Sequence, residues 1–352
     1  MKPAFIGYAT NQGITVIAHS LAKMFTEHEY LVVPHPGGVK MEKEWLDYHY
    51  KIAKQTHPDN EDVIRFFEET KPDVFIAVET PFNPNAFRIA RRLGIRSVFY
   101  PMVERFPADQ PEWRGVANDC DIILCPTKQA YKFFLNYYPD KTKYLPYPID
   151  VDRFEFKRRN DCFTFLHNAG HGGVACRKGT REMVQAFSMI KNKEVNLIIN
   201  SQKPKEHYGS VLSLIEQDDR IEFRHFNTND LNCLYRDGDV AVQPSKFEGI
   251  GLTVPESMAC GLPTITTNAA PMNEFVEDRK YLVDVEARTA SLSPNKDTLT
   301  NKVSVNHLAS IMEGLAGIDI SVTSEEVRKK IEEKFSYNSL KEKHRILFES
   351  LI

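Results

Sequence analysis

Apolar runs of strand length alternate with helix-length amphipathic segments through most of this chain. Strands that are each separated by a helix pair in parallel, because a parallel connection needs a long crossover, and their helices cover both faces of the sheet. The alternation therefore predicts the α/β class. A length of 352 residues exceeds what one hydrophobic core usually serves, so we expect two domains.

The apolar runs place the individual elements. Strands are predicted over residues 4–8, 31–33, 74–78, 97–100, 122–125, 163–166, 197–199, 221–226, 240–242 and 264–266. Helices are predicted over residues 14–25, 62–69, 85–93, 128–137, 182–190, 230–236, 255–260 and 325–352. The polar stretch 289–304 is interpreted as a loop.

The sequence YLPYPIDVDRF (residues 144–154) interrupts this alternation. Its prolines bracket an extended piece before the pattern restarts, as a connection between domains does. We therefore expect an N-terminal domain over residues 1–150, a second domain over 151–335 and a final helix over 336–352.

Composition excludes several classes of protein. The net charge is −3 and residues of both signs are mixed along the chain, so the sequence has no large electrostatic footprint that would announce a nucleic-acid partner. Six scattered cysteines without a CxxC pair favour reduced thiols and predict neither a disulfide nor a zinc site. The N-terminal apolar run is too short for a signal peptide and no stretch has transmembrane length, so the expected location is the cytoplasm.

One short basic segment leaves two interpretations open. Arg88, Arg91, Arg92 and Arg96 are close together in the sequence. They form either a solvated helix face or a peripheral contact with a membrane, and they favour an anionic acceptor such as a lipid or DNA.

The most informative stretch is DVAVQPSKFEGIGLTVPESMACGLPT (residues 239–264). A buried strand ends near Ser245, a loop with Gly249 and Gly251 follows, and a helix begins near Pro255. Glycines at such a turn let backbone N–H groups approach a ligand, and the helix N-terminus favours negative charge. The loop therefore predicts a diphosphate site, with Glu248 and Glu256 on either side of it. The alternative for Glu256 is a favourable acid in the first turn of a helix.

This stretch resembles the signature of the family 4 retaining glycosyltransferases, also called glycosyl transferases group 1, which have the GT-B fold. Two glutamates separated by seven residues are followed by a Met-Ala-Cys-Gly run, although Thr253, Val254 and Ser257 depart from the commonest form. Residues 144–154 and 117–127 are similar to the family's linker and to the strand before it. The likeness extends over residues 115–275.

The resemblance implies a GT-B enzyme with two Rossmann-like, doubly wound domains facing a cleft, and a final helix that returns to the first domain. The N-terminal domain would bind the acceptor and the second domain a nucleotide diphosphate sugar. Glu256 would bind the ribose, and Glu248 the transferred sugar. Gly251, Leu252 and Thr253 would lie at the phosphates.

The resemblance also assigns the basic pair Arg177 and Lys178 to the leaving diphosphate. The family's earlier Gly-Arg is replaced here by a stretch containing His171 and Gly172, so either Arg177 or His171 takes the role of the missing arginine. Fixed positive charge stabilises a departing diphosphate in place of a divalent metal, so neither a metal nor another cofactor is expected.

The first domain has weaker candidates. Gly13 follows the first strand at a turn where a backbone can approach a ligand, but the segment lacks the GxGxxG dinucleotide signature. Glu79 and Glu104 follow predicted strands, where ligands bind in open α/β sheets, and are acceptor candidates.

The resemblance therefore implies a retaining, metal-independent glycosyltransferase acting on the hydroxyl of a glycan, lipid, protein or modified DNA base. Two alternatives remain, a nucleotide-sugar epimerase of the same fold and a catalytically silent protein that binds sugar nucleotides. No obligate protein partner is evident. The sequence contains no pattern that identifies the base or the sugar of the donor, or the acceptor.

Overall fold

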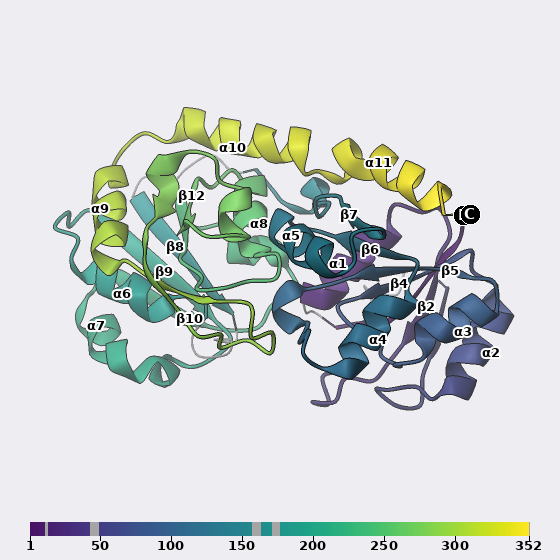
Figure 1. The fold of residues 1–352 in the computed structure, drawn as a ribbon. Helices are drawn as coiled ribbons and strands as arrows, with labels where there is room; N and C mark the ends of the chain where they lie inside the picture. The colour runs from purple at the N-terminus through teal and green to yellow at the C-terminus, as the bar shows by residue number, and fades with distance from the viewer. Residues whose placement is uncertain (11–12, 43–48, 157–162, 171–176, 352) are drawn as a thin grey trace. The chain divides into compact units, whose positions relative to one another are not determined.

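The computed structural model describes residues 1–10, 13–42, 49–156, 163–170 and 177–351. The chain divides into two compact units. Unit 1 comprises Met1–Pro148 together with Tyr337–Ile352, and unit 2 comprises Ile149–Ser336. Each has its own parallel sheet covered by helices, so the predicted α/β class is confirmed (Figure 1).

Unit 1 is built on a seven-stranded parallel sheet in the order β3-β2-β1-β4-β5-β6-β7. Its strands are β1 (Pro3–Gly7), β2 (Glu29–Val32), β3 (His49–Ile52), β4 (Val74–Val78), β5 (Arg96–Tyr100), β6 (Ile122–Cys125) and β7 (Thr142–Tyr144). Its helices are α1 (Gly13–Ala22), α2 (Asn60–Thr70), α3 (Ala86–Arg92), the 3₁₀ helix η2 (Val103–Arg105), α4 (Pro111–Asp119), α5 (Lys128–Tyr137) and α11 (Tyr337–Glu349).

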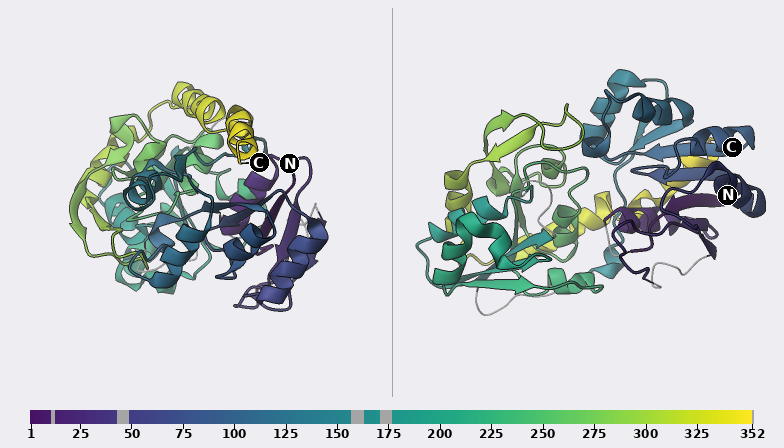
Figure 2. Two further views of the ribbon diagram at one scale, coloured as in Figure 1. Left: turned by 45° about the vertical axis from the view of Figure 1, so that its right-hand side comes forward. Right: turned by 90° about the horizontal axis from the view of Figure 1, so that it is seen from below.

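Side chains that alternate along each strand direct the two faces of this sheet to different helices. On one face an aromatic core joins the strands to α2, α3, α4 and α5, with Phe99 contacting Phe87, Phe106 and Phe134. On the other face the C-terminal helix α11 lies against the α1 region, where Phe348 packs on Phe25 at 5.4 Å between ring centroids. The two chain ends consequently lie near each other in unit 1 (Figure 2).

Unit 2 is built on a six-stranded parallel sheet in the order β10-β9-β8-β11-β12-β13. Its strands are β8 (Phe163–Gly170), β9 (Val195–Ser201), β10 (Ile221–His225), β11 (Val240–Gln243), β12 (Thr264–Thr267) and β13 (Leu282–Val283), with a separate hairpin of β14 (Val285–Thr289) and β15 (Thr300–Val303). Its α-helices are α6 (Thr180–Ser188), α7 (Leu212–Gln217), α8 (Thr253–Ala259), α9 (Val305–Leu315) and α10 (Ser321–Lys334). Its 3₁₀ helices are η3 (Val151–Arg153), η5 (Lys205–Val211), η6 (Leu231–Leu234), η7 (Met272–Glu274) and η8 (Arg279–Tyr281).

Two predictions from the sequence are wrong in detail, and the structure also divides the last helical segment. Residues 289–304 are not wholly a loop, because the hairpin strand β15 lies within them. The segment 230–236 forms only the short 3₁₀ helix η6. The helix-like segment 325–352 contains the end of α10 and all of α11, which begins at Tyr337, and the residues between them carry a bridge from Ser336 to Ile149.

Both sheets reverse their strand order once. In unit 1 the reversal falls between β1 and β4, and in unit 2 between β8 and β11. At such a switch point the loops that follow the two neighbouring strands diverge, which opens a crevice outside their carboxyl ends. The segments after β8 and β11 are therefore the first place to look for a site in unit 2.

Candidate functional site

The loop after β11 leads from the end of the strand into helix α8. Gly251 has a φ of +82°, a left-handed conformation that glycine adopts without a Cβ penalty. Leu252 and Thr253 then open α8, whose first N–H groups have no partner within the helix. Thr253 Oγ1 is buried and is among the atoms of the described residues without a hydrogen-bond partner.

Glu248 lies in this loop and is the centre of a buried cluster of charges. Its side chain is only 5% exposed, and one carboxylate oxygen accepts hydrogen bonds from Lys178 Nζ at 2.7 Å and Ser245 Oγ at 2.8 Å. The other oxygen accepts from the Arg177 guanidinium. The cluster brings together three residues that the sequence assigned to the chemistry, and adds Ser245.

The pKa values of the cluster follow from burial and pairing. Burial by itself would raise the pKa of Glu248, but the charges of Arg177 and Lys178 and the hydrogen bonds from Lys178 and Ser245 together lower it to about 2. Burial lowers the pKa of Lys178, and the neighbouring Arg177 lowers it further, while Glu248 and Glu256 oppose that change. Glu248 is therefore a carboxylate at neutral pH.

Two close backbone approaches fix the basic pair beside Glu248. The Lys246 N–H donates to the Arg177 carbonyl oxygen at 2.7 Å. Gly179 has a φ of +71°, and a Cβ on it would lie 2.2 Å from the Pro244 carbonyl oxygen. The segment after β8 thus packs directly on the segment after β11, across the switch point of the sheet.

His167 also connects the segments that follow β8 and β11. Its ring is fully buried, with Nδ1 2.6 Å from the Val242 carbonyl oxygen and Nε2 2.8 Å from Thr180 Oγ1. Burial lowers its pKa to about 4, and Lys178 adds to this effect. A neutral imidazole therefore links β8, β11 and the first residue of α6, which is a packing role.

Glu256 lies in the first turn of α8 and has a different partner. Its Oε2 accepts a hydrogen bond of 2.5 Å from the Tyr235 hydroxyl. Burial raises the pKa of Glu256, while the Tyr235 hydrogen bond and the charges of Lys178 and Arg153 oppose that rise. Lys178 therefore acts electrostatically on both glutamates of the predicted pair.

The remaining predicted residues have mixed outcomes. Gly249 is buried in the loop between Glu248 and Gly251. His171 and Gly172 lie outside the described residues. Sequence reasoning missed Ser245 and Tyr235. A polar residue at the end of β11 was a signal for Ser245, whereas only the tertiary fold brings Tyr235 to Glu256.

Unit 1 has a polar group at its own switch point. Glu79 follows β4 with a φ of +63°, unusual for a residue with a side chain, and its Oε1 is 3.1 Å from Arg105 Nε. Tyr8 follows β1; burial raises its pKa and the charge of Glu79 adds to the rise. Glu104 is a partly buried residue of η2, and Gly13 is the exposed first residue of α1.

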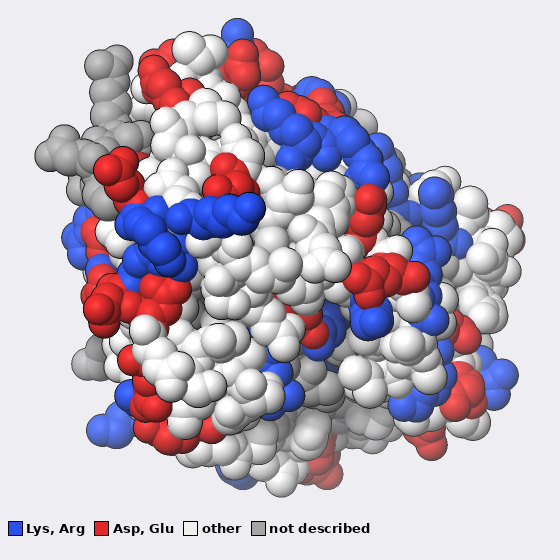
Figure 3. All heavy atoms as spheres, turned by 90° about the vertical axis from the view of Figure 1, so that its left-hand side faces the viewer, with Lys and Arg blue, Asp and Glu red and all other residues white. Residues whose placement is uncertain are grey.

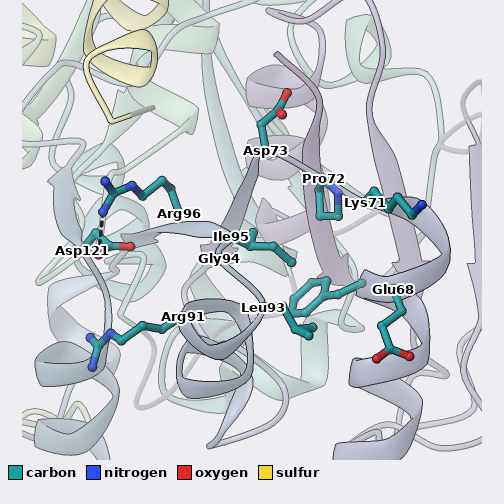
Figure 4. Close-up of a pocket in the computed structure, with 11 residues that line it drawn as sticks. Glu68, Lys71, Pro72, Asp73, Arg91, Leu93, Gly94, Ile95, Arg96 and Asp121 are labelled. Carbon is teal, nitrogen blue, oxygen red and sulfur yellow. Dashed lines mark ion pairs between the residues drawn. The ribbon is translucent and has the colours of Figure 1, made fainter.

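A hollow of about 770 Å³ in unit 1 lies elsewhere, at the amino ends of β4, β5 and β6 (Figure 4). Its charged lining residues include Arg91, Arg96, Asp73 and Asp121, so both signs are present. It is on the edge opposite to Glu79. We therefore separate this hollow from the candidate sites.

The arginine cluster noted in the sequence is largely paired. Arg88 Nε lies 2.7 Å from Asp119 Oδ2, and Arg91 Nη1 lies 3.9 Å from Asp119 Oδ1. Arg96 Nη1 lies 3.9 Å from Asp121 Oδ1. These pairs offset much of the positive charge and favour a solvated surface. Figure 3 shows a different face, the left-hand side of Figure 1, on which basic and acidic side chains surround an uncharged area.

Among the residues that the structure describes, no three His, Cys, Asp or Glu side chains gather in a way that could hold a metal ion. Within the same ranges, no helix has both the length and the apolar character to span a bilayer.

Comparisons with known proteins identify the relatives of this region and of the fold. Residues 169–301, which include the cluster, match the family model of the glycosyl transferases group 1. The whole chain superposes on HepE from Anabaena, solved in complex with UDP and glucose, with a TM-score of 0.74, 14% identity and 100% coverage of both chains. The chain has the GT-B fold and resembles the group 1 glycosyl transferases.

Other relatives match over shorter stretches. A mannosylfructose-phosphate synthase of Agrobacterium fabrum is 23% identical over 43% of this chain and 38% of its own length. The O-antigen chain mannosyltransferase B of Escherichia coli is 28% identical over 32% of this chain and 31% of its own. The matches thus span about a third of these relatives. A second GT-B structure, sucrose-phosphate synthase of Thermosynechococcus elongatus, has a TM-score of 0.68 at 15% identity, covering 100% of this chain and 99% of its own.

The packing of Gly179 on Pro244 generates a prediction about stability. Gly179→Ala forces a side chain into a left-handed backbone and against a carbonyl oxygen. The control Gly317→Ala has a similar φ of +78° in unit 2, but its nearest neighbour is 4.0 Å away.

We expect Gly317→Ala to lower the free energy of unfolding by about 1–2 kcal/mol. Gly179→Ala should lower it by a further ~1–3 kcal/mol, because a well-packed junction must shift. Urea unfolding of the two variants measures the difference. Equal losses would mean that this close approach does not hold the junction.

Proposed function

We propose that this protein is a retaining, metal-independent glycosyltransferase. It transfers a sugar from a nucleotide diphosphate sugar to an acceptor hydroxyl, and uses no other cofactor. The observation that carries the proposal is the buried cluster of Glu248, Arg177 and Lys178 beside the Gly251 loop. The match of this region to the glycosyl transferases group 1 supports it.

The diphosphate of the donor is the ligand that best fits the charges of the cluster. Arg177 and Lys178 both pair with the Glu248 carboxylate, so two cations are held side by side in a largely buried place, where they can bind a diphosphate. The N–H groups of Gly251, Leu252 and Thr253 and the Thr253 hydroxyl supply neutral donors beside it. In this proposal either Arg177 or His171 takes the role of the family's missing arginine at the diphosphate.

The two glutamates have separate roles in this proposal. Glu248 meets the transferred sugar, and Glu256 accepts hydrogen bonds from the ribose hydroxyls. During transfer the bond between the anomeric carbon and the diphosphate oxygen breaks, and its electron pair leaves with the diphosphate. The acceptor oxygen bonds to the same face of the anomeric carbon, and its proton passes to the departing diphosphate oxygen. Lys178 and Arg177 stabilise the growing negative charge without reorganisation.

In this proposal each unit binds one of the two substrates. Unit 2 binds the donor and unit 1 binds the acceptor, at the carboxyl edge where Glu79, Glu104 and Gly13 are the candidate contacts. The strained backbone of Glu79 and its pairing with Arg105 support a binding role there. The acceptor is a hydroxyl of a glycan, lipid, protein or modified DNA base.

UDP is the first donor nucleotide to test, because HepE was solved with UDP and with UDP-glucose. A thermal-shift series with UDP, GDP, ADP and CDP identifies the base, since a ligand that binds only the folded protein stabilises it. The comparisons give no support to the epimerase alternative. The silent-protein alternative predicts nucleotide binding without transfer.

The stereochemical outcome tests the proposed reaction. Incubation with the donor sugar found by the screen and an acceptor panel should give a product with the anomeric configuration of the donor. NMR of the first product formed, before any mutarotation, measures this directly. An inverted product would contradict the retaining mechanism, and binding without turnover across the panel would favour the silent protein.

The two glutamates can be separated by binding of the bare nucleotide. Glu256→Ala should weaken UDP binding, because each lost hydrogen bond to a charged acceptor is worth about 1.5–3 kcal/mol, or roughly tenfold to a hundredfold in Kd. Glu248→Ala should change UDP binding little and lower turnover instead. Calorimetry gives both constants. The reverse pattern would exchange the assigned positions of ribose and sugar.

Lys178 should contribute to turnover through the leaving diphosphate. Lys178→Ala should lower kcat by about 10²- to 10³-fold, because a preorganised contact to developing charge is lost. Lys330→Ala is a matched control, since Lys330 is also partly buried in unit 2 and lies 3.4 Å from Glu277. Initial rates at saturating donor compare them. Full activity of Lys178→Ala would refute the assigned role.

A further inference from the structure

Glu256 is useful to a ribose only if its carboxylate is ionised and held in one orientation. It lies in a buried place, where burial raises its pKa and so favours the neutral form. A protonated carboxyl turns one of its two oxygens into a donor and loses acceptor strength. A neighbouring group in unit 2 must therefore fix the orientation of this carboxylate and oppose the rise in its pKa that burial causes.

Tyr235 is placed to do both. Its hydroxyl donates to Glu256 Oε2, and its side chain is 1% exposed, so the contact is shielded from water. Burial and the charge of Glu256 raise the pKa of Tyr235 well above its usual value, so the phenol keeps its proton and remains a donor. Lys178 and Arg153 are the other charged groups that act on Glu256.

The backbone around Tyr235 is itself anchored from two sides. The Leu234 carbonyl oxygen accepts from Asn200 Nδ2 at 3.2 Å, and the same amide group donates to Asn168 Oδ1 at 3.0 Å. These asparagines come from β8 and β9 and are buried. The residue before Tyr235 is thus tied to the carboxyl end of the sheet.

The second anchor is Asn232. Its Oδ1 accepts from the Glu155 N–H at 2.9 Å and its Nδ2 donates to the Arg153 carbonyl oxygen at 3.1 Å. Phe154, between them, packs its ring edge-on against Tyr235 with 6.1 Å between centroids. The phenol therefore has little freedom to turn away from Glu256.

We propose that Tyr235 is a positioning residue for nucleotide recognition, which orients the Glu256 carboxylate and keeps it ionised for the ribose hydroxyls. The inference rests on the proposed function, because it assumes that Glu256 meets a ribose. It predicts that Tyr235 affects affinity only through the ribose hydroxyls.

Tyr235→Phe tests the inference by removing one hydroxyl and leaving the ring in its packing. UDP affinity should fall about tenfold, as expected for loss of a hydrogen bond to a charged group. 2′,3′-Dideoxyuridine diphosphate lacks both ribose hydroxyls, so it has no group for Glu256 to bind. The variant and the parent should therefore bind it within about twofold of each other, because the effects of two groups that do not interact are independent.

A matched control separates this role from general packing. Tyr208 is also fully buried in unit 2, and its hydroxyl lies 3.1 Å from Ser201 Oγ. Tyr208→Phe should leave UDP affinity unchanged and retain the difference between the two nucleotides. Thermal unfolding confirms that both variants are folded.

The pH dependence gives a second readout. Without the Tyr235 hydroxyl the pKa of Glu256 rises further, so the carboxylate is lost at a higher pH as the solution is acidified. The affinity defect of Tyr235→Phe should therefore grow as pH falls from 8 towards 5. A ¹³C NMR titration of the Glu256 carboxyl group reports the same pKa change without any nucleotide.

The outcomes distinguish two failures. If the parent binds none of UDP, GDP, ADP and CDP, the proposed function fails. If the parent binds UDP and Tyr235→Phe binds it equally, or loses affinity for the dideoxy nucleotide to the same extent, the inference is overturned. In a Glu256→Gln background, Tyr235→Phe should add less than a twofold change in UDP affinity, and a full tenfold loss there would also overturn it.

Discussion

The organisation of unit 2 depends on one buried carboxylate, Glu248, and on the two cations that pair with it. An ionised group removed from water is stable only when it is paired and hydrogen-bonded, because desolvation costs several kcal/mol per ion. Arg177, Lys178 and Ser245 meet that requirement. The same pairing holds the two cations in place before any ligand arrives. A site prepared in this way stabilises developing charge without moving its groups during the reaction.

The position of the cluster follows from the topology of the sheet. Strands β8 and β11 are neighbours although far apart in sequence, and the order of the sheet reverses between them. The segments that follow them meet through backbone contacts, Lys246 to Arg177 and Gly179 against Pro244. Glycine is required at 179 because any Cβ would occupy the space of a carbonyl oxygen. In unit 1 the strand order reverses between β1 and β4. Tyr8 and Glu79 follow these two strands, and the charge of Glu79 acts on Tyr8.

Much of this could be predicted from the sequence. Buried strands such as β4 and β6 are continuous apolar runs, and Gly251 and the two glutamates stand in one local stretch. Strand β3 was missed because His49–Ile52 is a short exposed edge strand in which polar and apolar side chains alternate, so it gives no apolar run. The pairing of Tyr235 with Glu256 could not be found either, because it joins a 3₁₀ turn to a helix through the tertiary fold. Local pattern located the candidate loop, and only packing supplied the partners of its side chains.

The central claim is that Glu248, Arg177 and Lys178 form a prepared diphosphate site next to a ribose site at Glu256. A crystal structure of the protein with bound UDP tests it most directly. The account predicts the diphosphate within hydrogen-bond distance of Lys178 and the Thr253 hydroxyl, and both ribose hydroxyls on the Glu256 carboxylate. Nucleotide density away from the carboxyl ends of β8 and β11, or a ribose with no contact to Glu256, would contradict it.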